Sequence, residues 1–416
     1  MEINAIGAII GLIIAIVLIL KKQVPAYSLM LGAFIGGLVG GADISQTVGL
    51  MIEGAKGITP AIIRILTAGV LAGGLIKSGA AEVIAESIVK VLGEKKSLFA
   101  LALATLILTS VGVFVDVAVI TVSPIALALG KRLNFSKMSI LIAMIGGGKS
   151  GNIISPNPNT IAAAAAFKVN LFDLMKANII PAIAGLIVAT LLAKYLVNKG
   201  DKVTEEIEGE EIDNKPTFLQ AIIGPVVTIL LLALRPIAGI NIDPLIALPT
   251  GGIIACLVMG KGKHIGEYSA YGLTKMTGVA ILLVGTGTIA GIISHSTLKE
   301  VIAGGLSDLG LAPYLLAPIS GALMSAATAS TTAGTAVASA AFSKIILASG
   351  VNGLYGAAML HAGATVLDHL PHGSFFHATA GSTGTGLKER LKLIPYESAV
   401  GFTLALVSTI IYGIIL

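Results

Sequence analysis

Two polar, proline-containing segments interrupt apolar stretches of this sequence. The first lies within Gly146–Ala166, GGGKSGNIISPNPNTIAAAAA, and the second is Asp368–Ser374, DHLPHGS. Proline lacks an amide hydrogen and clashes with the preceding turn, so a helix cannot run unbroken through either segment. At membrane depth, the backbone groups freed by such a break are tolerated only where they line a cavity or are buried in protein. The two breaks therefore predict binding segments inside a membrane protein.

The composition excludes an ordinary soluble domain. Of the 416 residues, 55% are hydrophobic and 12% are charged, whereas soluble domains carry roughly 25% charged residues. The net charge of +5 indicates no nucleic-acid partner, because the basic residues fall mostly in short loops between apolar runs. The single cysteine, Cys256, excludes a disulfide framework. We predict an all-α polytopic protein of the cytoplasmic (inner) membrane.

Apolar runs of about bilayer length, on the order of 20 residues, predict the individual spans. Two longer or polar-centred runs in each half predict a re-entrant hairpin followed by a broken span. The predicted spans are Ile3–Leu20, Pro25–Ala42, Gly57–Ile76, Asn178–Val197 and Ala399–Leu416. The predicted hairpins are Ser97–Gly130 and Leu311–Ile346, and the predicted broken spans are Met138–Ala166 and Asn352–Ala380.

The second half of the chain repeats the first. Leu71-Ala-Gly aligns with Ile289-Ala-Gly, Glu82-Val-Ile-Ala with Glu300-Val-Ile-Ala, and Ile154-Ser-Pro with His369-Leu-Pro, at a nearly constant offset. A register held over the whole chain indicates an internal duplication. We predict a first repeat at residues 1–197, a cytoplasmic acidic linker at 198–216 and a second repeat at 217–416. The linker's acidic cluster is Glu205, Glu206, Glu208, Glu210 and Glu211.

Lysine and arginine in short loops predict the orientation, because such residues concentrate on the cytoplasmic side. The residues assigned to that side are Lys21, Lys22, Lys90, Lys95, Lys96, Lys131, Arg132, Lys137, Lys261, Lys263, Lys388, Arg390 and Lys392. The assignment gives five spans and one hairpin per repeat. Because each repeat would cross the membrane an odd number of times, the second repeat would begin on the opposite side from the first. The repeats would therefore be inverted, with both termini extracytoplasmic. Inverted repeats with broken helices at the midplane are typical of secondary transporters.

Two charged residues fall at the predicted membrane depth of the first repeat. Asp116 lies at the first hairpin turn and Lys149 in the first broken span. Charged residues at this depth usually belong to ion or substrate pathways, so we predict a role in ion coupling for both. The alternatives are that Asp116 caps a helix, and that Lys149 snorkels or pairs with Asp116.

The second repeat offers two polar clusters. Thr328–Thr335 places hydroxyls at a helix break, where the positive end of a helix attracts carboxylates; helix packing through small polar residues is the alternative. Asp368, His369 and His372 gather at the second break. Histidine titrates near neutral pH and suits proton relay, so Asp368 and His369 are predicted to couple ions. The alternatives are satisfaction of the broken backbone, and a metal site, which a transport break disfavours.

The predicted substrate-binding residues come from the two breaks and the second hairpin turn. They are Asn152, Ser155, Asn157, Asn159, Thr160, Ser330, Thr331, Thr332, His372 and Ser374.

These segments resemble the GntP family of gluconate permeases, within the ion transporter superfamily. The resemblance is carried by Ala72–Glu94, by Asp116 where the family has Glu, and by three motif segments: Ser155–Ala163, Ala326–Ala333 and Leu367–Phe375. This chain carries Asn157 in place of the family's histidine in PPHPGP. The resemblance implies transport of gluconate and related hydroxy-acids, D-serine or hydroxybutyrate by proton symport.

We therefore predict a secondary active transporter for a small organic anion, working by proton-coupled symport and alternating access. The alternative is a cation/proton antiporter of the same superfamily, with Asp116 and Asp368 as the exchanging pair. A passive channel is disfavoured because a continuous pore needs no alternating access. No hydrolytic or redox constellation stands out, so we predict no enzyme, cofactor or metal site. The expected partners are a small carboxylate, protons (sodium is the alternative), the lipid bilayer and, in an assembly left open, further copies of the chain.

Overall fold

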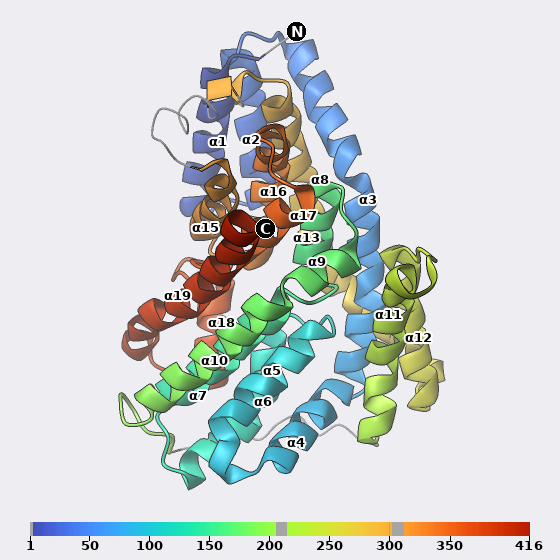
Figure 1. Ribbon diagram of the computed structural model, residues 1–416, viewed down its shortest axis with the longest axis vertical. Coiled ribbons are helices and arrows are strands. Elements are labelled where there is room, and N and C mark those ends of the chain that lie inside the picture. Colours follow the sequence, from blue (N-terminus) through green and yellow to red (C-terminus); the bar gives the residue numbers. More distant parts are fainter. Residues whose placement is uncertain (1–2, 205–213, 299, 302–311) are drawn as a thin grey trace.

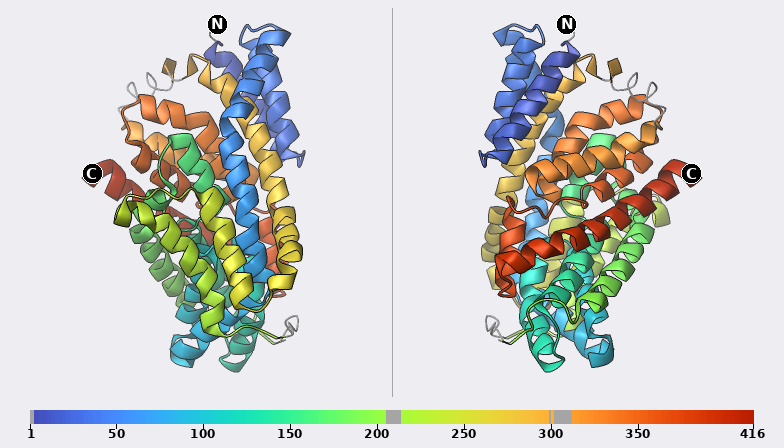
Figure 2. Two further views of the ribbon diagram at one scale, coloured as in Figure 1. Left: turned by 90° about the vertical axis from the view of Figure 1, so that its right-hand side faces the viewer. Right: turned by 90° about the vertical axis from the view of Figure 1, so that its left-hand side faces the viewer.

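The computed structural model describes residues 3–204, 214–298, 300–301 and 312–416, without the side chains of 235 and 236. The predicted acidic cluster and the start of the predicted second hairpin lie outside these residues. So does Ala303, the last residue of the aligned segment Glu300-Val-Ile-Ala. Within the described residues, helices dominate and pack side by side into an elongated molecule (Figures 1 and 2). This confirms the predicted all-α class.

The helices of the first half follow the order expected from the sequence. They are α1 (Ala5–Leu20), α2 (Pro25–Val39), α3 (Ile44–Lys77), α4 (Ala80–Leu92), the 3₁₀ turn η1 (Glu94–Lys96), α5 (Ser97–Ser110), α6 (Val115–Arg132), α7 (Lys137–Asn152), α8 (Pro158–Phe167), α9 (Leu171–Ala177) and α10 (Ile179–Leu196). The short helix α9 was not anticipated. The predicted first hairpin corresponds to α5 and α6, and the first broken span to α7 and α8.

The described residues of the second half present a similar succession, without a counterpart of α4 or α9. Its helices are α11 (Phe218–Ala238), α12 (Pro244–Val258), η2 (Gly262–His264), α13 (Ile265–Ser294), η3 (Pro313–Leu315), α15 (Leu316–Thr328), α16 (Thr331–Ala348), α17 (Gly353–Gly363), α18 (Ser374–Ser382) and α19 (Leu387–Thr409), which continues as π-helix η4 (Ile410–Ile415). Both helix breaks predicted from proline are confirmed, between α7 and α8 and between α17 and α18. The pair α5–α6 lies towards one end of the molecule and α15–α16 towards the other (Figure 1).

Two predicted boundaries are wrong. Helix α3 begins at Ile44 rather than Gly57, because Asp43 and Gln46 form a capping box: Asp43 Oδ1 accepts from the Gln46 amide at 2.8 Å, and Gln46 Oε1 from the Asp43 amide at 3.1 Å. Helix α19 begins at Leu387 rather than Ala399 and contains Pro395. Arg390, assigned to a cytoplasmic loop, is instead fully buried on α19.

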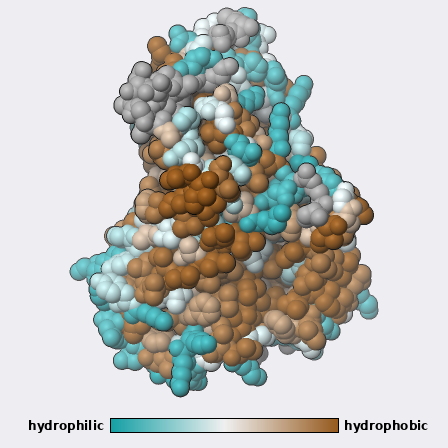
Figure 3. All heavy atoms as spheres, in the orientation of Figure 1, coloured by the Kyte–Doolittle hydropathy of each residue, from teal (hydrophilic) through white to brown (hydrophobic). Residues whose placement is uncertain are grey.

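Five helical segments of the described chain are long and apolar enough to cross a bilayer. They are Ile44–Lys77, Ile179–Leu196, Gly262–Ser294, Thr331–Ala348 and Leu387–Ile415. Figure 3 shows hydrophobic residues across the middle of one face, with hydrophilic residues gathered towards the ends. This distribution is the one that a lipid environment requires.

Helices α3 and α13 run side by side through the molecule (Figure 2) and touch through glycines. A Cβ atom on Gly272 would lie 1.8 Å from the Gly69 carbonyl oxygen, and one on Gly54 would lie 2.1 Å from the Gly287 carbonyl oxygen. Gly54 and Gly272 are 218 residues apart, as are Gly69 and Gly287. The two close contacts therefore exchange equivalent positions of the two halves. In the same way, α16 packs against α8 while α6 packs against α18.

Candidate functional site

A cavity of about 340 Å³ lies where the two hairpin turns meet the two helix breaks. It takes its walls from α6, α8, α13, α16 and α18, with the ends of α7 and α15. The lining residues are Phe114, Val115, Asp116, Val117, Asn152, Asn159, Lys275, Val279, Ala329, Ser330, Thr331, Thr332, Asp368, Ser374 and Phe375. The two predicted hairpin turns and the two predicted breaks thus all contribute residues to one cavity.

Four helices begin at this cavity. The first residues of α6, α16 and α18 and the second residue of α8 all belong to its wall. A helix N-terminus carries partial positive charge and free amide hydrogens. Two of these ends are capped by side chains: Ser330 Oγ accepts from the Ala333 amide at 3.2 Å, and Asn157 Oδ1 accepts from the Asn159 and Thr160 amides at 3.0 and 3.1 Å. Helix N-termini of this kind favour an anion.

Lys149 and Asp368 form a buried ion pair behind the cavity wall. Lys149 Nζ lies 2.5 Å from Asp368 Oδ1, 2.8 Å from the Thr365 carbonyl oxygen and 2.8 Å from His369 Nδ1. An ammonium group has three donors, and these three acceptors satisfy all of them. Lys149 therefore pairs with Asp368 and not with Asp116, as the sequence had left open. The other carboxylate oxygen of Asp368 accepts a hydrogen bond from Thr331 Oγ1, so the second hairpin turn is joined to the second break.

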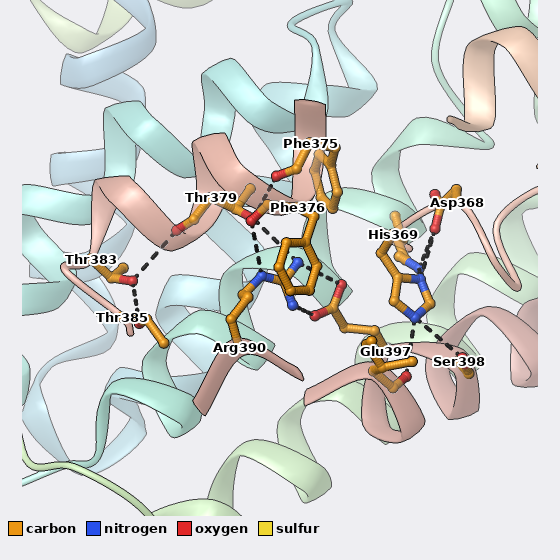
Figure 4. Close-up of polar contacts among 12 residues, drawn as sticks. Asp368, His369, Phe375, Phe376, Thr379, Thr383, Thr385, Arg390, Glu397 and Ser398 are labelled. Atoms are coloured by element: carbon orange, nitrogen blue, oxygen red, sulfur yellow. Dashed lines mark hydrogen bonds and ion pairs between the residues drawn. The ribbon is translucent and has the colours of Figure 1, made fainter. Parts of the chain in front are cut away.

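His369 extends this cluster away from the cavity. Its Nδ1 lies 2.8 Å from Lys149 Nζ and 3.0 Å from Asp368 Oδ1, and its Nε2 lies 3.0 Å from the Ile394 carbonyl oxygen. Ser398 Oγ lies 3.2 Å from the same nitrogen. Figure 4 shows His369 between Asp368 and Ser398, on the α19 side of the break.

A second buried ion pair, Arg390 with Glu397, lies beside this cluster on α19. Arg390 also donates to the Phe376 carbonyl oxygen at 3.2 Å and to Thr379 Oγ1 at 3.3 Å, and its guanidinium stacks on the Phe376 ring (Figure 4). These bonds fix α18 against α19. Sequence reasoning missed this pair because Arg390 resembled the basic residues of a loop; the carboxylate seven positions later was the available signal.

The asparagines of the first break form one network. Asn152 Oδ1 accepts from Asn157 Nδ2 at 2.5 Å and from Asn159 Nδ2 at 3.1 Å. Within the described chain, Asn152 Nδ2 and Asn159 Oδ1 have no hydrogen-bond partner, and both residues line the cavity. The network thus leaves one amide donor and one amide acceptor for a bound molecule.

Asp116 lies in the cavity wall on the first turn of α6. Among the residues that the structure describes, its Oδ1 accepts only from the neighbouring amide of Val117, at 2.9 Å, while the N-cap position belongs to Phe114. Asp116 is therefore not the capping residue of α6. Lys275 of α13 also lines the cavity; the sequence analysis did not single it out because it follows a run of small and polar residues.

The structure separates the predicted residues into two groups. Asn152, Asn159, Ser330, Thr331, Thr332, Ser374, Asp116 and Asp368 line the cavity. Lys149 and His369 lie directly behind Asp368. Ser155, Asn157, Thr160 and His372 are not part of the lining; Asn157 caps α8, and His372 Nε2 lies 3.3 Å from the Ala327 carbonyl oxygen.

Known proteins are similar to this chain over nearly its whole length. The family described as GntP family permease matches residues 3–415. An uncharacterized transporter of Haemophilus influenzae is 63% identical over 99% of each chain. A gluconate permease of Bacillus licheniformis is 24% identical over 95% of this chain and 98% of its own. The solved YdaH transporter of Alcanivorax borkumensis has a similar fold, with a TM-score of 0.63, 15% identity and 89% of both chains covered.

Proposed function

Because the chain belongs to the GntP permease family, we propose that it carries a small hydroxy-carboxylate across the cytoplasmic membrane together with protons. It is a multi-pass integral membrane protein and not an enzyme. The observation that carries the proposal is the convergence of four helix N-termini on one polar cavity between the two hairpins.

The chemistry of the cavity supports a ligand with both a carboxylate and hydroxyl groups. The helix N-termini and Lys275 favour a negative charge. Asn152 Nδ2 is free to donate to a carboxylate oxygen, and Asn159 Oδ1 is free to accept from a ligand hydroxyl. The Bacillus licheniformis relative is named a gluconate permease, and gluconate has this combination of groups.

The two carboxylates of the cavity support a role for protons. Asp368 is paired with Lys149 at 2.5 Å, whereas Asp116, within the described residues, accepts a hydrogen bond only from the Val117 amide. A substrate carboxylate beside ionised Asp116 would be repelled, so substrate binding and protonation of Asp116 favour each other. This mutual preference is what symport requires. The relatives give no support to the cation/proton antiporter.

The reciprocal glycine contacts support the mechanism of alternating access. A contact made twice with the two halves exchanged indicates a two-fold relation between them. Because a two-fold axis in the membrane plane inverts one repeat, the pair of hairpins would face opposite sides. We propose that the hairpins open in turn, giving the cavity access to one side at a time.

Transport into proteoliposomes tests the proposal. Labelled gluconate, D-serine and 3-hydroxybutyrate are offered with and without an inward proton gradient, and at least one should accumulate only with the gradient. Thr332→Val should raise the KM about fivefold, since losing a hydrogen bond costs roughly 1 kcal/mol. Thr335→Val is the matched control, because Thr335 lies one turn further along α16, outside the cavity lining. Absence of uptake of every carboxylate, or equal effects of both variants, would contradict the proposal.

A further inference from the structure

A second cavity, of about 510 Å³, is lined by residues of η1 and the start of α5. These segments follow α4 at one end of the molecule (Figure 1). Its walls come from η1, the start of α5, the loop between α6 and α7, and the end of α10. The volume falls within the range of ligand pockets, roughly 300–1,000 Å³. None of its lining residues belongs to the transport cavity.

Positive charge predominates in this cavity. Lys95, Lys96 and Lys194 all line it, and within the described chain none of them forms an ion pair or hydrogen bond. The acidic residue of the lining, Glu94, is already neutralised by Arg132, whose Nη2 lies 2.8 Å from Glu94 Oε1. The three lysines are therefore available to an external anion.

Ser97 gives an independent indication of an anion at this position. The residue is only 3% exposed and lines the cavity, yet its hydroxyl has no hydrogen-bond partner in the described chain. Ser97 is also the first residue of α5, whose N-terminus has no side-chain cap. The Ser97 amide already donates to the Glu94 carbonyl oxygen, so the hydroxyl is the group left to donate to an oxyanion.

An apolar stripe on α10 leads directly to the lysines. Ile180, Ile183, Ile187 and Leu191 are between 52% and 61% exposed and follow one another at helical spacing, so they occupy one face. Lys194 and Tyr195 end the stripe one turn later. Tyrosine and lysine at the end of an apolar helix face mark the membrane–water boundary.

We propose that this cavity binds an anionic phospholipid. The lipid phosphate would accept a hydrogen bond from the Ser97 hydroxyl, and its charge would be balanced by Lys95, Lys96 and Lys194. The acyl chains would lie along the exposed stripe of α10. A soluble phosphate could satisfy only the polar part, whereas a lipid occupies both the basic cavity and the adjoining apolar face.

Thermal unfolding of the purified full-length chain in detergent micelles tests this site. Dioleoylphosphatidylglycerol should raise the Tm by several degrees more than dioleoylphosphatidylcholine. The difference should vanish in the variant carrying Lys95→Gln, Lys96→Gln and Lys194→Gln. A control variant with Lys90→Gln, Lys263→Gln and Lys388→Gln removes the same charge from exposed positions outside the cavity and should keep the difference.

Two further measurements separate the possible sources of the anion. Inorganic phosphate and glycerol phosphate should leave the Tm unchanged, and native mass spectrometry should detect bound phosphatidylglycerol on the wild type and the control. Ser97→Ala, which keeps the charge, should reduce the lipid-dependent shift even if the triple variant folds poorly. The proposal is wrong if a soluble phosphate reproduces the full shift, if the control loses it too, or if Ser97→Ala and the lysine variant both retain it.

Discussion

Asp116 and Asp368 line the same cavity but have different surroundings. Asp368 bonds to Lys149 and Thr331 and is 4% exposed, so its charge is compensated inside the protein. Asp116 is half-buried and accepts a hydrogen bond from the adjacent amide of Val117. A carboxylate whose charge is already balanced gains little by taking a proton, whereas one that faces an arriving anion gains more. Asp116 is therefore the better candidate for the residue that takes up the coupling proton.

Replacing Asp116 by Asn should uncouple transport. The neutral amide resembles the protonated carboxyl group, so Asp116→Asn should still exchange labelled for unlabelled substrate across the membrane. It should not concentrate substrate in response to a pH gradient, and the inside concentration should only equal the outside one. Proteoliposomes measured for both exchange and accumulation give the result.

Asp173→Asn is the control for this experiment, because Asp173 pairs with Lys176 at 3.2 Å outside the cavity. It should accumulate substrate like the wild type. If Asp116→Asn itself accumulates substrate with the pH dependence of the wild type, Asp116 is structural, and proton coupling must be sought at Asp368 and His369.

At the scale of single residues, the sequence predicted which polar positions matter better than it predicted their partners. Asn152, Thr331 and Asp368 were recognisable because polar residues in apolar segments are rare and costly. Lys149 was recognised for the same reason, but its partner was not, because Asp368 is 219 positions away and only the folded helices bring the two together. Lys275 was missed, since a lysine near the polar end of an apolar run gives no distinct signal.

At the scale of helices, close backbone contact between α3 and α13 depends on individual glycines. A side chain on Gly272 would collide with the Gly69 carbonyl oxygen, an atom that cannot move without shifting the whole helix. By contrast, a Cβ atom on Gly278, in the same helix, would meet nothing within 4 Å. These two glycines therefore separate the effect of packing from the effect of helix propensity.

Gly272→Ala should lower the Tm in detergent, because overpacking at such a contact costs roughly 1–3 kcal/mol. Gly278→Ala should leave the Tm unchanged or raise it slightly, since alanine in a helix interior is favoured over glycine by about 1 kcal/mol. Differential scanning calorimetry, or a fluorescence melt with a dye that does not react with thiols, measures the Tm of both variants. Equal Tm values for the two variants would mean that α3 and α13 do not pack as described.

Helix breaks were easier to predict than helix ends. Proline and glycine determine breaks locally, so the interruptions after α7 and α17 could be located from residues such as Pro156 and Pro371. The start of α3 depends on the reciprocal bonds of Asp43 and Gln46 in a polar stretch, and hydropathy does not detect such bonds. Likewise, the start of α19 lies in a charged segment that becomes helical because Arg390 finds a buried partner in Glu397.

At the scale of the whole molecule, the nearly constant register of the matching segments predicts a repeat. The prediction that this repeat is inverted rests on the odd number of spans and on the distribution of lysine and arginine. The reciprocal contacts between α3 and α13 and between the hairpins and breaks agree with that orientation. Sidedness in the membrane depends on the lipid bilayer itself, so it is the property that most needs a direct measurement.

Equivalent positions of the two repeats should face opposite sides of the membrane. Lys131 lies at the end of α6, and Ser349, 218 residues later, directly follows α16. Ser45 and Lys263 are also 218 residues apart. In a Cys256→Ala background, single cysteines at Lys131 and Lys263 should react with a membrane-impermeant maleimide only from the cytoplasmic side. Cysteines at Ser45 and Ser349 should react only from the opposite side, because inversion exchanges the two faces.

Right-side-out cells and inverted vesicles provide the two faces for this labelling, and uptake by each variant confirms that it is folded. If Lys131→Cys and Lys263→Cys are labelled from opposite sides, α5 and α6 do not enter and leave on one face, and the repeats are parallel. If both members of one equivalent pair are labelled from the same side, the two-fold axis does not lie in the membrane plane. Only opposite labelling within each pair leaves alternating access through two oppositely facing hairpins as the geometry of this permease.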